Sequence, residues 1–334
     1  MTTLIGSAAR SPLDAAARAL ANAMPPAEIA FDVPLASLGR WQIGGPADIV
    51  VTPTDAGSLA LTLRLIADLG VPHIILGDGS NLLFDNAGFR GVVIRIGRAF
   101  DSLTLEDDGV VVAGAGWWVP SFVRHLINAG LSGAVHAIGI PGTLGGLVTM
   151  NGGSQRKGIG DNVLSVDVVD RHGMPRRLEH HELGYGYRRS RLQSGEHIVT
   201  AIRFRFERAD PSALRREAID ILRSRRAKFP KVRANCGSVF VSDPKLYSLI
   251  GPPGLAIEKA GLKGFAIGDA QFSPEHANFI VNNDSARSQD VLALIALARS
   301  RVYDLTGIAM NAEVRHLSPD GTMRPAHEVA PAAG

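Results

Sequence analysis

Residues 139–153, which read GIPGTLGGLVTMNGG, constrain the fold of this chain more than any other stretch. They hold six glycines, one proline and one asparagine in fifteen positions. Ordering glycine costs conformational entropy, so a cluster of this kind indicates that the backbone comes unusually close to something. Exposed backbone N–H groups in such turns can bind phosphate oxygens. We therefore interpret this stretch as a phosphate-binding loop.

A second glycine-rich loop lies upstream. Residues 76–83 read LGDGSNLL and follow an apolar run over 71–76. Two such loops predict an extended ligand with two phosphates, such as a dinucleotide cofactor. Neither loop reads GxGxxG or lies in a clear strand–loop–helix unit followed by an acidic residue about 20 positions on, which argues against a Rossmann site. The alternative is that both loops are tight turns of a β-rich domain.

The composition is that of an ordinary globular protein. Of the 334 residues, 46% are hydrophobic and 20% are charged, and the length is enough for two or three domains. The net charge is only +3 and no RNP or zinc-finger pattern is present, so we expect no nucleic-acid partner. A mildly positive surface suits a small anionic substrate. No run reaches about 18 apolar residues, so we expect no membrane span.

The chain has one cysteine, Cys236. A single cysteine excludes a disulfide framework and a cysteine-based zinc or iron–sulfur site, and no HExxH spacing is present, so we expect no metal. The cysteine usage and the lack of a signal-peptide pattern at the N-terminus predict a cytoplasmic protein.

Shifts in composition divide the chain into a leader, three units and a tail. Residues 1–30 are alanine-rich and predict a short helix or a mobile leader, with ordered structure beginning near Phe31. The first unit is 31–96, where strands and a helix alternate, and the second is 97–207, which is richer in strands. The third unit is 208–318, which reads as α+β, and residues 319–334 are a polar tail that we expect to be disordered.

Local patterns predict the main strands and helices. Strands are expected where apolar residues are contiguous or alternate, at 48–52, 71–76, 92–96, 110–113, 164–170, 198–206 and 308–317. Helices are expected where capping residues or apolar residues at helical spacing occur, at 54–69, 121–129, 211–226 and 289–305.

Two short motifs could supply a cation and a proton donor. Arg188 in the motif YRRS could hold a carboxylate through two parallel hydrogen bonds, although a solvated basic turn is the simpler interpretation. Ser238 in the motif CGSVF could donate a proton if its neighbours orient the hydroxyl, whereas a serine after glycine is usually a turn residue. If the backbone is extended there, Cys236 and Ser238 share a face.

Two further motifs contain a carboxylate and a histidine. Strand alternation over 308–317 would put Glu313, in AEVR, on the same face as Arg315, and the alternative is a surface glutamate beside that arginine. His276 begins the motif HANFIVN, and a lone histidine in such a place is more often structural than catalytic.

Together these motifs resemble the UDP-N-acetylenolpyruvoylglucosamine reductases, also called UDP-N-acetylmuramate dehydrogenases. The resemblance spans about residues 38–317, and the order of the motifs is more specific than any one of them. In chain order they are IGGPAD, LGDGSNLL, GIPGTLGG followed by MNGG, DNVLSVDVVDRHG, YRRS, CGSVF, IEKAGLKG, HANFIVN and AEVR. No tyrosine-bearing insertion is evident, so the chain is similar to the shorter subtype of the family.

The resemblance implies a fold and a reaction. The fold would be α+β, with a vanillyl-alcohol-oxidase (PCMH-type) FAD-binding fold in two subdomains and a C-terminal α+β substrate-binding domain. The cofactor would be FAD, reduced by NADPH. The substrate would be an anionic nucleotide sugar, UDP-N-acetylglucosamine enolpyruvate, reduced to UDP-N-acetylmuramate for peptidoglycan. We expect a cytoplasmic monomer or weak oligomer.

The resemblance also implies roles for individual residues. Arg188 matches the catalytic arginine, Glu313 matches a glutamate that acts as a protonated donor, and Ser238 matches the serine that delivers a proton. The residues expected at FAD are Gly77, Asp78, Gly79, Ser80, Asn81, Leu82, Ile140, Pro141, Gly142, Gly145, Gly146, Asn151, Ile198 and Val199. The residues expected at the substrate are Tyr187, Lys228, Lys259, His276 and Asn278, and Arg225 and Arg226 are further candidates for its nucleotide end.

One departure from the family pattern concerns the substrate side. Val241 and Ser242 replace the usual Lys-Asn pair. This leaves a divergent paralogue, with the same flavin chemistry on a different enol ether or nucleotide sugar, as the main alternative. A non-catalytic FAD- or nucleotide-binding regulator is a third hypothesis. A covalent flavin oxidase is a fourth, with His136 as the histidine nearest to the glycine-rich loops.

Overall fold

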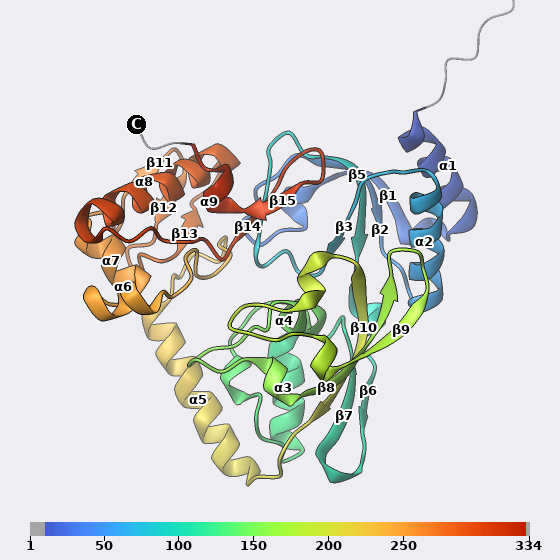
Figure 1. The fold of residues 1–334 in the computed structure, drawn as a ribbon, viewed down its shortest axis with the longest axis horizontal. Helices are drawn as coiled ribbons and strands as arrows, with labels where there is room; N and C mark the ends of the chain where they lie inside the picture. The colour runs from blue at the N-terminus through green and yellow to red at the C-terminus, as the bar shows by residue number, and fades with distance from the viewer. Residues whose placement is uncertain (1–10, 332–334) are drawn as a thin grey trace, which may run out of the picture.

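The computed structural model describes residues 11–331 of the chain. In Figure 1 two sheet-containing parts lie beside a smaller, mainly helical part that carries the C-terminal third of the chain. The N-terminal sheet has the order β1-β2-β5-β3, with β2, β5 and β3 parallel and β1 antiparallel. Its strands are β1 (Ile29–Pro34), β2 (Pro46–Val51), β3 (His73–Leu76) and β5 (Phe89–Arg95).

Two helices lie beside this sheet, and one of them corrects the expectation for the leader. α2 (Ala56–Asp68) is capped by Asp55, whose side chain accepts the Ser58 N–H. This cap lies one residue after the predicted start of the helix at 54. α1 (Pro12–Ala23) packs against α2 and buries Ala16 and Leu20. Ordered structure therefore begins well before Phe31, and residues 1–10 of the predicted leader lie outside the described residues.

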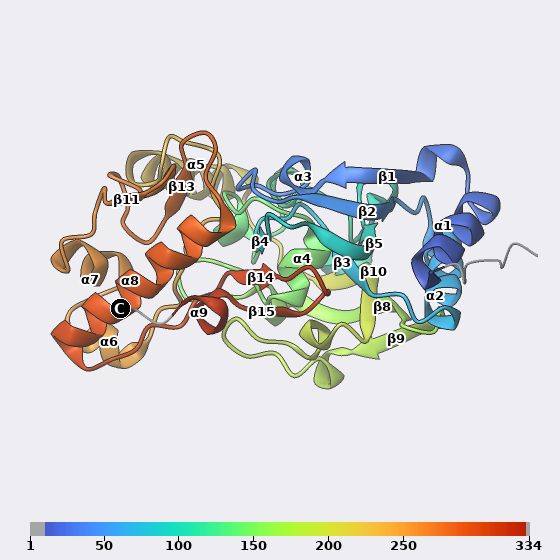
Figure 2. The ribbon, with the colours of Figure 1, turned by 90° about the horizontal axis from the view of Figure 1, so that it is seen from above.

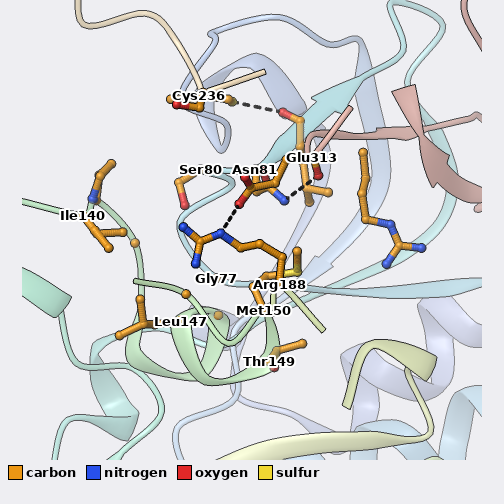
Figure 3. Close-up of a pocket in the computed structure, with 18 of the residues that line it drawn as sticks. Gly77, Ser80, Asn81, Ile140, Leu147, Thr149, Met150, Arg188, Cys236 and Glu313 are labelled. Atoms are coloured by element: carbon orange, nitrogen blue, oxygen red, sulfur yellow. Dashed lines mark hydrogen bonds and ion pairs between the residues drawn. The ribbon is translucent and has the colours of Figure 1, made fainter. Parts of the chain in front are cut away.

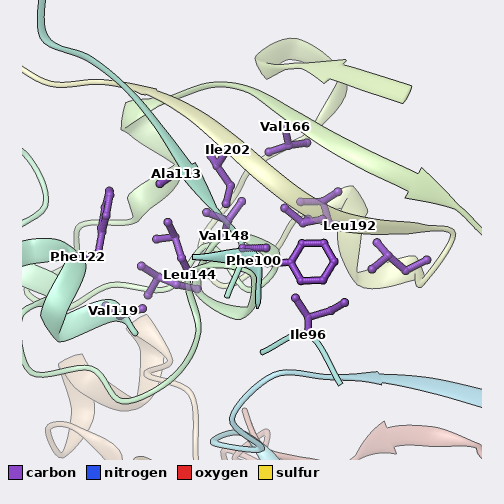
Figure 4. Close-up of a cluster of buried hydrophobic side chains, with 14 of the residues drawn as sticks. Ile96, Phe100, Ala113, Val119, Phe122, Leu144, Val148, Val166, Leu192 and Ile202 are labelled. Carbon is purple, nitrogen blue, oxygen red and sulfur yellow. The ribbon is translucent and has the colours of Figure 1, made fainter. Parts of the chain in front are cut away.

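The central sheet is antiparallel, with the order β6-β7-β10-β8-β9. Its strands are β6 (Leu103–Leu105), β7 (Val110–Gly114), β8 (Val163–Asp170), β9 (Pro175–Glu179) and β10 (His197–Arg205), and its helices are α3 (Val119–Asn128) and α4 (Leu144–Thr149). Figure 4 shows the core between them, where Phe122 of α3 and Val148 of α4 belong to one cluster with Ile202 of β10. This core fixes residues 139–153, because α4 lies within that stretch.

The C-terminal lobe follows α5 (Pro211–Lys228), which Figure 1 shows running along the side of the molecule. Asp210 caps α5 through the N–H groups of Ser212 and Ala213, as predicted. The lobe contains α6 (Pro244–Leu249), α7 (Pro253–Lys259) and α8 (Ser288–Thr306), with a small sheet of β11 (Ala266–Ile267), β12 (Ala270–Phe272) and β13 (Ile280–Asn282). The predicted helices at 54–69, 121–129, 211–226 and 289–305 are thus confirmed to within a few residues.

A second small sheet joins the C-terminal lobe to the N-terminal sheet region, as Figure 2 shows. β14 (Arg315–Leu317) pairs in parallel with β4 (Leu82–Phe84) and antiparallel with β15 (Met323–Pro325). The predicted strand at 308–317 is therefore wrong in length, because only its last three residues form a strand. The preceding residues run as a loop with one isolated bridge, between Phe240 and Ala312.

The predicted disordered tail is also wrong for the residues that the structure describes. After β15 the chain forms α9 (Ala326–Val329), and Ala326 is fully buried with its N–H donating to Val314 O. His327 Nδ1 accepts the N–H of Ala312 at 3.0 Å. The tail is ordered because it covers the segment that carries Glu313. Residues 332–334 lie outside the described part.

Candidate active site

One cavity of about 930 Å³ lies between the two larger sheets and the C-terminal lobe. Both glycine-rich loops line it, and Figure 3 shows Gly77 and Ser80 of the first loop facing Ile140 and Leu147 of the second. Of the residues predicted at the cofactor, all line this cavity except Asn151. The two loops therefore belong to one site, as a ligand with two phosphates requires.

The first loop presents its backbone to the cavity. The N–H groups of residues 77–81 make no hydrogen bond within the described part of the chain. Gly79 has φ +60°, and a Cβ there would lie 2.7 Å from Leu38 O, so only glycine fits. A Cβ at Gly77 would collide with the Thr143 side chain of the second loop. Unpaired N–H groups in a cradle of this kind form an anion-binding nest.

The second loop is held by the central sheet. The N–H of Leu144 donates to Trp117 O and that of Gly145 to Ala115 O, both at 2.8 Å. Ile198 and Val199 of β10 add an apolar wall beside it. A flavin dinucleotide needs apolar walls beside an anion nest, since its flat ring system has large apolar faces and its diphosphate is charged. The residues present therefore fit FAD.

Asn151 and His136 support the second loop from behind. The Asn151 amide donates to Gly186 O at 2.8 Å and accepts the Gly160 N–H at 2.9 Å, so its side chain braces the YRRS turn instead of facing the cavity. His136 is buried, and its Nδ1 accepts the N–H of Ser154 at 3.4 Å. Neither residue lines the cavity.

Arg188 and Glu313 form an ion pair inside the cavity, with Arg188 Nε 3.1 Å from Glu313 Oε1. The same guanidinium donates to Gly153 O at 2.6 Å and to Asn151 O at 3.3 Å. Arg188 has φ +54°, an uncommon backbone conformation for a residue with a side chain. Figure 3 shows the pair between the two glycine-rich loops. Neither simpler interpretation holds, since Arg188 is not a solvated turn and Glu313 does not pair with Arg315.

Burial controls the protonation of Glu313. Removal from water raises the pKa of this carboxyl above its ordinary value of 4.5, and the charge of Arg188 opposes the rise. Arg315 also lines the cavity, and burial lowers the pKa of its guanidinium. A second space of about 450 Å³ adjoins the same three side chains. The pair therefore stands where a bound anion could reach both the two arginines and the Glu313 carboxyl.

Ser238 lies in the same cavity, held close to Glu313 by the backbone. The Glu313 N–H donates to Val239 O at 2.8 Å, and the Val239 N–H donates to Asn278 O at 2.8 Å. Gly237 has φ +79°, so the backbone is not regularly extended there and the expected shared face of Cys236 and Ser238 does not form.

Cys236 ties the Ser238 segment to the first loop. Its thiol donates to Leu82 O at 3.4 Å and to Gly79 O at 3.6 Å. Burial raises the pKa of this thiol to about 12, so it is a structural hydrogen-bond donor and not a nucleophile.

The predicted substrate residues divide into two groups. Tyr187, His276 and Asn278 line the cavity, although the Asn278 side chain is occupied by Phe240, whose N–H it accepts at 2.9 Å and whose carbonyl it bonds at 3.0 Å. Lys228 and Lys259 are exposed and do not line the cavity, so their role at the substrate stays a prediction. The direction of a side chain at a helix end depends on packing that the sequence does not show.

Arg225 enters the cavity in their place. Its guanidinium stacks on the Phe229 ring at 4.4 Å, close against Gly139, and burial lowers its pKa to about 10. Phe229 in turn contacts the rings of His276 and Phe279. Arg226, the other arginine of this helix end, does not line the cavity. The sequence analysis missed Phe229 and Arg315, and the nearest signals were the helix end and the AEVR motif.

Residues 11–331 contain neither a cluster suited to a metal ion nor a helix suited to a membrane. Among residues 11–331 no group of three or more His, Cys, Asp or Glu side chains could hold a metal ion. In the same range no helix is long and apolar enough to cross a membrane.

Two regions of the chain that line the cavity match known protein families. Residues 47–179 match an FAD-binding domain, and residues 229–317 match the C-terminal domain of UDP-N-acetylenolpyruvoylglucosamine reductase. The chain is 45% identical to UDP-N-acetylenolpyruvoylglucosamine reductase 1 of Corynebacterium glutamicum, over 90% of each chain. It is 42% identical to the reductase of Heliobacterium modesticaldum, over 86% of this chain and 90% of that one.

A solved structure agrees with these sequence relationships. The UDP-N-acetylenolpyruvylglucosamine reductase of Thermus caldophilus matches with a TM-score of 0.72 and 33% identity, over 85% of this chain and 97% of that one. The predicted fold class, a two-subdomain FAD-binding fold with a C-terminal α+β domain, is confirmed. This chain belongs to the UDP-N-acetylenolpyruvoylglucosamine reductase family of FAD-containing oxidoreductases.

Proposed function

We propose that this protein reduces UDP-N-acetylglucosamine enolpyruvate to UDP-N-acetylmuramate for peptidoglycan synthesis, with FAD as cofactor and NADPH as electron donor. The observation that carries the proposal is the pairing of Arg188 with Glu313 in the cavity that Ser238 and both glycine-rich loops line. An anion nest, a cation, a carboxyl of raised pKa and a hydroxyl in one cavity are the groups that reduction of an enolpyruvyl ether needs.

FAD would lie between the two glycine-rich loops. The unpaired N–H groups of residues 77–81 would bind its diphosphate, and Ile198 and Val199 would border its ring system. When bound, FAD supplies a hydride to the alkene after reduction by NADPH. In this proposal residues 31–96 and 97–207 are the two FAD-binding subdomains, and residues 208–318 are the substrate-binding domain.

Three side chains would manage the charge and the proton. Hydride addition to the terminal alkene carbon builds negative charge on the adjacent carbon and its carboxylate. Arg188 is already oriented by two carbonyls and would stabilise that charge without reorganising. Burial raises the pKa of Glu313, and once this carboxyl takes up a proton it would donate a hydrogen bond to the substrate carboxylate. Ser238 would deliver the proton that completes the reduction.

The nucleotide end would lie toward the C-terminal lobe. Arg225 is a half-buried cation on the cavity wall and makes no ion pair within residues 11–331, so a phosphate group of the substrate would supply its counter-charge. His276 and Phe229 lie beside it and offer ring faces. The free, buried thiol of Cys236 is consistent with a reducing cytoplasm, where we place the protein, as a monomer or weak oligomer.

The test is a visible spectrum of the purified protein under anaerobic conditions. NADPH should bleach the flavin bands, and the UDP-enolpyruvyl sugar should restore them as the product forms. Bands that bleach and do not return with this sugar would instead support a paralogue acting on another enol ether. A preparation that neither contains flavin nor binds it on reconstitution would refute the proposal.

One observation favours that paralogue as the second candidate. Ser242 lines the main cavity and Val241 lines the adjoining one, and both replace larger polar residues of the family pattern. A neutral, shorter pair would hold a nucleotide sugar through fewer polar contacts. Turnover of the UDP-enolpyruvyl sugar at a rate above that of other enol ethers would remove the case for it.

A further inference from the structure

Arg40 lies beside the first glycine-rich loop and connects it to the second. Its Nη1 is 3.5 Å from Asp78 Oδ2, and its guanidinium carbon is 6.0 Å from the centre of the Trp118 ring. Trp118 forms an isolated β-bridge with Thr143, in the second loop. Arg40 therefore contacts the first loop directly and lies near the second loop only through Trp118, and its own side chain does not line the cavity.

Asp78 poses an electrostatic problem that Arg40 can solve. The carboxylate is part of the loop whose N–H groups form the anion nest, and it lines the cavity. Without a cation it would repel the diphosphate that the nest binds. Burial raises the pKa of Asp78, while the charge and hydrogen bond of Arg40, and then the charge of Arg95, lower it. Arg40 is thus the main cation that compensates this carboxylate.

The backbone around Arg40 fixes its distance to the loop. The Arg40 N–H donates to Gly79 O at 3.4 Å, and Gly79 packs so closely on Leu38 and Gly39 that no Cβ would fit. The main chain of Arg40 is thus held beside the loop, next to the residue that follows Asp78.

We propose that Arg40 is a positioning residue for FAD, which neutralises Asp78 and thereby keeps the first glycine-rich loop able to accept the cofactor's diphosphate. The proposal rests on FAD binding in this cavity and is independent of the substrate. Its mechanism is charge compensation, so a lysine should replace Arg40 better than an uncharged residue of similar size.

The experiment measures the FAD dissociation constant of the apoprotein by quenching of flavin fluorescence. Arg40→Gln should raise the constant about tenfold or more, and Arg40→Lys should raise it less than about threefold. Asp78→Asn should bind FAD at least as tightly as the wild type. In the Asp78→Asn background, Arg40→Gln should cost less than about threefold, because no carboxylate remains to be neutralised.

Controls separate this proposal from a defect of folding. Arg177→Gln breaks an exposed ion pair with Asp167 of 2.7 Å on the central sheet and should leave the FAD constant unchanged. Thermal unfolding of each apoprotein shows whether the variants fold. If Arg40→Gln weakens FAD binding equally in the wild-type and Asp78→Asn backgrounds, or does not weaken it at all, the proposal is overturned. Absence of FAD binding by the wild-type apoprotein would instead contradict the proposed cofactor site itself.

Discussion

Arg188 and Glu313 meet at 3.1 Å although they come from different loops and lie far apart in the sequence. Each arrives there through local backbone geometry. The left-handed φ of Arg188 turns its side chain toward Asn151 and Gly153, and Glu313 is held by its N–H bond to Val239 O. Strained conformations of this kind persist where the surrounding structure fixes them, often at functional sites. The pair is therefore assembled before any substrate arrives.

Arg188→Lys should lower kcat/KM about 10²- to 10³-fold, since a lysine cannot donate to two carbonyls and a carboxylate in one plane. Steady-state kinetics with the UDP-enolpyruvyl sugar measure the effect. The neighbouring Arg189→Lys is the matched control, because Arg189 is exposed and should change kcat/KM little. Equal losses in the two variants would contradict the role proposed for Arg188.

Ser238→Ala should separate the two half-reactions. Reduction of the bound flavin by NADPH does not need the Ser238 proton and should keep its rate. Reoxidation by the substrate should slow about 10²- to 10⁴-fold, the usual range for a general acid. Stopped-flow absorbance under anaerobic conditions follows both steps. A variant that reoxidises at the wild-type rate would exclude Ser238 as the proton donor.

The pKa of Glu313 predicts how stability depends on pH. Burial raises this pKa in the folded chain, so the folded state holds the proton more tightly than the unfolded state. The protonated Glu313 therefore contributes fully to the stability of the folded chain below the ordinary pKa of 4.5, and this contribution is lost as pH rises through the raised pKa. Glutamine does not titrate, so the Glu313→Gln variant does not lose this contribution. The Tm of the variant minus the Tm of the wild type should therefore rise between pH 4 and pH 8. A constant difference in Tm would show that Glu313 titrates normally.

The ordered tail predicts that a substitution outside the cavity lining disables the site. Ala326 is fully buried beneath the Glu313 segment, so Ala326→Asp places an unpaired carboxylate there and should cost on the order of 3 kcal/mol. The loss should appear as a lower Tm and a lower kcat. Glu328→Ala, three residues before the end of the described chain, is the control and should change neither quantity by much. A fully active Ala326→Asp variant would show that the tail does not support the site.

Local signals predicted the long helices well. α5 and α8 have clear caps or apolar spacing, and both form within a few residues of the predicted bounds. Residues 308–317 and the tail were predicted poorly because their conformation depends on distant partners. β14 exists through its pairing with β4, more than two hundred residues earlier, and α9 exists through burial on the C-terminal lobe. No pattern within a short window records such pairing.

The site shows the same contrast between features that a local pattern indicates and features that depend on distant packing. The glycine-rich loops were recognisable because backbone exposure demands glycine, whatever the rest of the fold does. Arg188, Ser238 and Glu313 were identified from the order of motifs, and none of them was distinctive alone. Lys228 and Arg225 stand on the same helix end, and only packing of Arg225 against Gly139 and Phe229 decides which cation faces inward.

The parallel pairing of β14 with β4 has a consequence for how the protein is made. Synthesis on the ribosome runs from the N-terminus, so the first glycine-rich loop emerges early and waits for its neighbouring strand until nearly the whole chain is complete. Glu313 can take its place only after the residues of β15 and α9 have left the exit tunnel. A nascent chain that stalls before these residues emerge would therefore already hold most of the proposed cofactor cradle, yet Glu313 would not be in its place.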